Sequence, residues 1–167
     1  MKILFFNLLL VLSFICSAQT NEEAYHIKGK CYEGYVFPKE NTIDADWMPF
    51  NDIRERYTPT NDDIIRAENI LQEQLRNINK QALMNQGKGC PNIYKKLNKY
   101  KRQYFGYINN EGEKIIWINC VWYKNEDVLE LWNKQVITIL DGCSYYWNIK
   151  VNLKQDKLFD LIVNGSA

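Results

Sequence analysis

The chain has 167 residues, of which 21 are Lys or Arg and 20 are Asp or Glu, so the formal net charge at pH 7 is +1. This near neutrality gives no support for nucleic acid or an anionic membrane as a partner, since both attract strongly basic proteins. The length fits one domain with a substantial core. Function therefore has to be sought in the motifs.

Residues 1–18 have the features of a secretion signal. A basic residue precedes an apolar run from Ile3 to Ile15, and the small residues Cys16 and Ala18 place cleavage before Gln19. The run is shorter than the ~20 residues that cross a bilayer. We therefore expect a secreted or periplasmic protein with no membrane span after cleavage. Lipid attachment at Cys16 is the alternative.

Residues 19–57 are predicted to pack on the domain as extended segments and turns. They begin with a polar stretch up to Lys30 and then become aromatic, with Pro38 and Pro49 as chain breakers. The apolar residues of this part follow no sustained period, so neither a helix nor a regular strand is predicted.

Residues 60–82 carry the clearest helical pattern. Thr60 can cap the first turn, where Asp62 and Asp63 interact favourably with the helix dipole. Apolar residues then recur at intervals of three and four, which places them on one stripe: Ile64, Ala67, Leu71, Leu75, Ile78 and Ala82. Glycines downstream of this stripe end the helix.

The second half of the chain is typical of β-strands. Tyr100–Ile108 and Lys114–Tyr123 flank a short turn and predict a hairpin. Three more strands are predicted over Gln135–Leu140, Cys143–Leu153 and Lys157–Val163. In Cys143–Leu153 apolar and polar residues alternate, with Cys143 on the inner face. Residues 125–132 are left open between a helical turn and a loop.

These elements predict an α+β fold, in which residues 58–167 place one long helix on a four- to five-stranded antiparallel sheet and residues 19–57 belong to the same domain. The element order resembles the cystatin-like and nuclear-transport-factor-like folds. No inhibitory residues carry over from the cystatins, because the hairpin reads Asn109-Asn110-Glu111-Gly112 where a cystatin has Gln-x-Val-x-Gly.

An even number of cysteines, Cys31, Cys90, Cys120 and Cys143, remains after residue 18. In an exported protein this favours disulfides. Cys120 and Cys143 fall in strands of one predicted sheet, which leaves Cys31 to join Cys90 at the helix exit, and we take these two bonds as the hypothesis. The sequence has no Cys-x-x-Cys motif and no Cys/His cluster, so no metal or cofactor is predicted.

Several short stretches resemble the small uncharacterised secreted proteins of Bacteroidota-type bacteria. They are Ser17-Ala18-Gln19, Arg102-Gln103-Tyr104-Phe105-Gly106-Tyr107, Ile118-Asn119-Cys120, Asp141-Gly142-Cys143 and Asn164-Gly165-Ser166-Ala167. The resemblance implies no particular activity. Because the signal looks bacterial, we interpret the glycosylation triplet at Asn164 as chance.

The sequence provides little material for catalysis. His26, the only histidine, lies in the polar lead-in. Carboxylate pairs occur at Asp44/Asp46, Asp62/Asp63 and Glu126/Asp127, and ordinary loop or helix positions explain each of them. No catalytic residue is predicted. A small hydrolase or isomerase with a carboxylate such as Asp160 in a sheet cavity is one alternative, and an inhibitor or immunity protein is another.

Aromatic residues make up 14% of the chain and gather in neighbouring predicted strands. Because strands alternate their faces, these rings cannot all point into one core. Rings on the face away from the helix would form a binding surface, unless residues 31–57 cover them. We predict a non-enzymatic module that contacts a protein or a polysaccharide through Trp117, Trp122, Tyr145 and Trp147.

Overall fold

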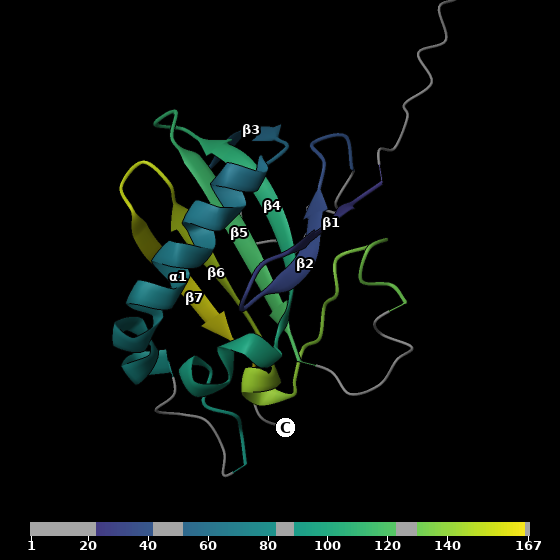
Figure 1. Cartoon of the computed structure of the whole chain (residues 1–167). Coiled ribbons are helices and arrows are strands. Elements are labelled where there is room, and N and C mark those ends of the chain that lie inside the picture. Colours follow the sequence, from purple (N-terminus) through teal and green to yellow (C-terminus); the bar gives the residue numbers. More distant parts are fainter. Residues whose placement is uncertain (1–22, 42–51, 83–88, 123–129, 166–167) are drawn as a thin grey trace, which may run out of the picture.

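The computed structural model describes residues 23–41, 52–82, 89–122 and 130–165. Within these ranges one long helix, α1 (Asn61–Ala82), lies across a face of a mixed sheet, so the fold is α+β as expected (Figure 1). The predicted signal lies outside the described residues. The described residues form seven strands, which are β1 (Tyr25–Lys28), β2 (Glu33–Phe37), β3 (Ile53–Tyr57), β4 (Lys101–Asn109), β5 (Lys114–Val121), β6 (Tyr146–Asn152) and β7 (Lys157–Val163).

The prediction of helix α1 is confirmed. The Thr60 hydroxyl accepts a hydrogen bond from the Asp63 N–H, and the Asp63 carboxylate accepts one from the Thr60 N–H, both at 3.1 Å, which closes a reciprocal cap. The apolar stripe from Ile64 to Leu75 is buried against the sheet. Among the helices in the described part of the chain, none is long and apolar enough to cross a membrane.

The sheet has the order β1-β2-β4-β5-β6-β7, and β3 pairs with the end of β4 that β2 leaves open. The prediction of four to five antiparallel strands is therefore wrong in two respects. Residues 23–57 add three strands, which are too short to show a strand period, and β2 runs parallel to β4. Gly34 makes this pairing possible, because a Cβ there would lie 2.5 Å from the Arg102 carbonyl oxygen.

The central strands β4, β5 and β6 have one face against α1 and one face away from it, which we call the outer face. The helix side forms the main core, where Trp147, Ile149 and Val151 confirm the predicted alternation of β6. The outer face carries Gln103, Phe105, Trp117, Asn119, Tyr146, Asn148 and Lys150. Many of these side chains are buried, so another segment of the chain packs on the outer face as well.

Residues 130–140, which we call the strap, cross the outer face. The predicted strand Gln135–Leu140 is wrong, since this part of the described chain pairs with no strand. Its apolar side chains pack on the sheet instead, with Trp132 and Ile137 against Val121 and Tyr146. Next to the strap, Phe37 of β2 stacks on Phe105 with 4.5 Å between ring centres. Phe37 therefore extends the apolar outer face to β2, and the strap covers part of this face.

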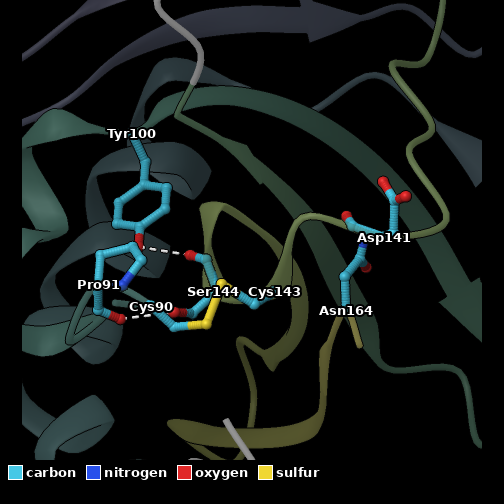
Figure 2. Close-up of a disulfide and its surroundings, with 7 residues drawn as sticks. All are labelled: Cys90, Pro91, Tyr100, Asp141, Cys143, Ser144 and Asn164. Atoms are coloured by element: carbon cyan, nitrogen blue, oxygen red, sulfur yellow. Dashed lines mark hydrogen bonds between the residues drawn. A yellow bond between two sulfur atoms is a disulfide. The ribbon is translucent and has the colours of Figure 1, made fainter. Parts of the chain in front are cut away.

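The predicted disulfide pairing is wrong. The structure joins Cys90 to Cys143, 53 residues apart, with 6.0 Å between their Cα atoms (Figure 2). Cys143 does not belong to strand β6 as predicted but to the short 3-10 helix η3 (Cys143–Tyr145) before it. Cys31 and Cys120 are not disulfide-bonded, the first being exposed and the second buried under α1.

Candidate functional site

Two buried amides hold the strap on the outer face. Gln103 and Asn119 lie opposite each other on β4 and β5. The Gln103 amide donates to the carbonyl oxygens of Trp132 (2.9 Å) and Gln135 (2.7 Å), and its oxygen accepts from the Ile137 N–H at 2.9 Å. Asn119 donates to the Ile137 carbonyl at 2.9 Å. These side chains satisfy backbone groups that a neighbouring strand would otherwise have to pair.

Beyond Asn119 the strap and the sheet enclose a pocket of about 270 Å³, which is the candidate site. One wall is the strap from Val136 to Leu140, and the other is the outer face of β5, β6 and β7 with Asn164 at its end. None of the lining residues is Asp, Glu, Lys, Arg or His. The pocket is therefore built for a neutral group.

Trp117 and Asn148 form the floor of the pocket. The Trp117 indole N–H donates to the Asn148 side-chain oxygen at 3.1 Å, so this polar pair is satisfied within the protein. The Trp117 ring also packs on Phe105, with 5.3 Å between ring centres, and is only 3% exposed. The floor is thus a fixed aromatic surface, without a ring face open to solvent.

Two aliphatic side chains stand at the mouth of the pocket. Leu140, at the end of the strap, is 93% exposed, and Ile162, on β7 opposite, is 42% exposed. Single exposed aliphatic residues are common on protein surfaces, whereas apolar residues gathered around a concave site mark a place of contact. The site therefore combines a neutral cavity with an apolar rim.

Asn164 fixes the end of the pocket wall. Its side-chain amide donates to the carbonyl oxygens of Ile139 and Asp141, the second at 3.0 Å, and its backbone N–H donates to Tyr146 at 3.1 Å. Figure 2 shows Asn164 beside Asp141, close to the disulfide. This amide nitrogen is engaged in the fold, which agrees with the interpretation of the glycosylation triplet as chance.

The structure does not gather the four predicted aromatic residues on one face. Trp117 and Trp147 both border the pocket, but Trp147 is 1% exposed and belongs to the main core on the helix side, where it packs on Tyr100. Trp122 and Tyr145 lie together, with 5.3 Å between ring centres, at the end of the sheet next to Tyr100. The four rings do not form one exposed patch.

A buried polar cluster lies under α1, away from the pocket. Arg102 pairs with Glu68 at 3.2 Å and also donates to the Leu97 carbonyl at 2.9 Å, while the Tyr104 hydroxyl donates to Glu68 at 2.9 Å. Burial and the nearby Glu68 carboxylate raise the pKa of Tyr104 well above its usual value. Burial likewise raises the pKa of the Cys120 thiol. The cluster ties the helix to the sheet and keeps both groups neutral.

Asp160, the carboxylate considered for a sheet cavity, pairs with Lys150 at 2.9 Å and is half exposed on β7. It does not line the pocket. His26 lies on β1 beside Glu33 and Tyr35, and it does not line the pocket either. Within the described residues, no three His, Cys, Asp or Glu side chains come together in a way that could hold a metal ion.

Sequence reasoning missed most of the pocket. Asn148, Asn164 and the strap residues 136–140 are far apart in sequence, and only the crossing of the strap brings them together. One signal was available in the sequence. Asn119 and Asn148 each stand between two apolar residues of a strand and so lie on the opposite face, and amides on that face need polar partners. No protein-family model, no curated protein and no solved structure matches the chain.

Proposed function

We propose that the protein is an exported, non-enzymatic binding module, and that the pocket under the strap receives an apolar side chain of a partner protein. The observation that carries the proposal is the uncharged pocket with Leu140 and Ile162 exposed at its mouth. Burying such side chains contributes about 25 cal/mol per Å² of apolar area removed from water. An inhibitor or immunity protein would be one case of such a module.

A protein partner is favoured over a polysaccharide by the state of the aromatic rings. A sugar-binding surface needs ring faces open to solvent, and both Trp117 and Trp147 are buried. Trp122 and Tyr145 are half-buried, but they pack on each other and do not line the pocket. The amide nitrogens of Asn119 and Asn164 already donate to strap carbonyls or their neighbours. What the pocket presents to a ligand is uncharged, with aliphatic side chains along the strap and at its mouth.

The Cys90–Cys143 disulfide supports export, because disulfides persist in oxidising compartments. The apolar run in residues 1–18 supports the same conclusion. Together they favour a periplasmic or secreted setting, in which the partner would be another exported or surface protein.

The proposal can be tested with small probes and ¹⁵N spectra of the protein. N-acetyl-leucinamide should shift the Trp117 indole signal and the strap amides, with a Kd of about 1 mM, which suits a ligand of this size. N-acetylglucosamine should leave them unchanged. The variant Ile162→Asp should weaken binding, whereas Ile65→Asp on the exposed side of α1 is the matched control. Shifts caused by the sugar alone would favour a polysaccharide, and shifts caused by neither probe would refute the proposal.

A further inference from the structure

The pocket wall is tied to the disulfide by a short chain of contacts. Cys143 is bonded to Cys90, and its backbone N–H donates to the Gly165 carbonyl at 2.8 Å. Asn164, the neighbour of Gly165, holds Asp141 and Ile139 through its side-chain amide. A displacement of Cys143 would therefore reach the end of the pocket wall at Ile139 and Asp141.

Cys143 is held in an unfavourable backbone conformation. Its φ is 45°, in the left-handed region that residues with a Cβ seldom adopt, and it follows Gly142, whose φ is 85°. Such a residue keeps this conformation only where its surroundings impose it. Here the disulfide imposes it from one side and the bond to Gly165 from the other.

The loop around Cys143 is also held by hydrogen bonds of the neighbouring Ser144, which do not depend on the disulfide. The Tyr100 hydroxyl donates to the Ser144 carbonyl and the Ser144 hydroxyl donates to the Pro91 carbonyl, both at 2.6 Å (Figure 2). These bonds hold Ser144 next to Cys90 whether or not the sulfur atoms are joined. Loss of the disulfide would thus release Cys143 and the residues before it, while the rest of the loop stays in place.

We propose that the Cys90–Cys143 disulfide is a redox switch of the pocket: when it is reduced, Cys143 leaves the left-handed conformation and the strap wall at 136–141 loosens. This inference rests on the proposed function, since it concerns the regulation of the same pocket. The expected loosening of the strap does not depend on the proposed function, because it can be measured in the protein without a ligand.

The reductant would be a dithiol. One of its thiolates attacks the sulfur of Cys90, the more accessible of the two cysteines, and expels the Cys143 thiolate. The second thiol of the reductant then displaces Cys90 and closes the reductant's own disulfide. The protein gains two electrons and two protons, and the dithiol loses them.

Amide hydrogen exchange of the full chain tests the inference without a ligand. After Cys31 has been alkylated, residues 136–141 should exchange at least about tenfold faster in protein reduced with dithiothreitol than in oxidised protein. The amides of Ile116 and Ile118 in the buried centre of β5 are the internal reference. Equal exchange at 136–141 in both states would overturn the proposal, and so would an equal acceleration in β5, which would mean global loosening.

Three variants separate the covalent bond from the backbone strain. Cys90→Ser removes the bond and keeps Cys143, whose Cβ disfavours a positive φ, so it should behave like the reduced protein. Cys143→Gly also removes the bond, but glycine accepts a positive φ, so the strap should exchange more slowly than in Cys143→Ser. Equal exchange in Cys143→Gly and Cys143→Ser would overturn the strain mechanism. If the strap loosens as expected while no probe binds the oxidised protein, the proposed function fails and this inference stands.

Discussion

Glu68 of α1 and Arg102 of β4 form an ion pair at 3.2 Å, and the two side chains are almost completely excluded from water. The second oxygen of Glu68 has no hydrogen-bond partner among the described residues. Arg102 and Tyr104 are therefore the groups that stabilise the buried negative charge of Glu68. Removing one partner of such a pair leaves a buried charge, which costs far more than the pair itself contributes.

We expect Arg102→Met to lower the free energy of unfolding by about 3–5 kcal/mol, because it leaves the Glu68 carboxylate buried without a cation. Urea unfolding followed by fluorescence measures the effect. The matched control is Arg66→Met, which breaks the exposed pair with Asp156 and should cost at most ~0.5 kcal/mol. Similar losses in the two variants would contradict the assignment of Arg102 as a central support of the fold.

Gln103→Leu should release the strap. The substitution removes the amide that bonds to the backbone of Trp132, Gln135 and Ile137. Because buried carbonyl and N–H groups then lack partners, we expect a loss of about 2–4 kcal/mol. Hydrogen exchange should accelerate first over residues 130–140. A loss of stability that leaves the strap as protected as before would show that packing of Trp132, not the amide, holds it.

In the chain that begins at Gln19, the two cysteines outside the Cys90–Cys143 disulfide should differ in reactivity. Cys31 is exposed, while Cys120 is buried in the main core and its thiol pKa is raised by burial. Ellman's reagent should therefore titrate Cys31 in the native protein and Cys120 only after unfolding, without any reductant. The variant Cys31→Ser supplies the control and should show no fast phase. Rapid native reaction of Cys120 would contradict its burial under α1.

Protonation of Glu113, among other groups, should lower the free energy of unfolding in acid. Hydrogen bonds from Asn152 first, then from Gln155 and Lys154, lower the pKa of the Glu113 carboxyl, and the distances to Asn152 and Gln155 are 2.6 and 2.7 Å. A lowered folded-state pKa gives stability that is present above the unfolded pKa of about 4.3 and is lost as the pH falls through the folded value.

The variant Glu113→Gln should therefore lose less stability than the wild type between pH 6 and pH 3. Urea midpoints at several pH values measure this difference. Glu73→Gln, on the exposed side of α1, is the matched control and should follow the wild type. An unchanged acid dependence in Glu113→Gln would mean that other carboxyl groups dominate the transition.

The features that could be predicted from sequence are those that depend on local periodicity. The α1 stripe from Ile64 to Leu75 and the alternation of β6 around Ile149 both bury one face, and each pattern is visible in a single segment. The strap shows why the rest could not be predicted. Val136–Ile139 has the β-branched composition of a strand, but side chains of the sheet, Gln103 and Asn119, satisfy the backbone N–H and carbonyl of Ile137.

The candidate site illustrates the same limit. The pocket depends on where residues 136–140 cross β6 and β7, and the crossing is set by amides and by the disulfide loop, not by a periodic pattern. The expected pairing of Cys120 with Cys143 failed because it assumed that Cys143 lies within a strand. Cys143 lies in one turn of 3-10 helix instead, and there it forms its disulfide with Cys90.

The parallel pairing of β2 with β4 has a consequence for the order in which the chain folds. Glu33 and Lys101, joined by an ion pair at 2.6 Å across these strands, are 68 residues apart in sequence. Contacts of such separation form late, because a long loop must close first. The hairpins β4–β5 and β6–β7 can therefore assemble before β1 and β2 dock, and until then the edge of β4 from Arg102 to Phe105 stays open to pairing with other chains. The nascent chain is thus most exposed to aggregation before its own first strands return.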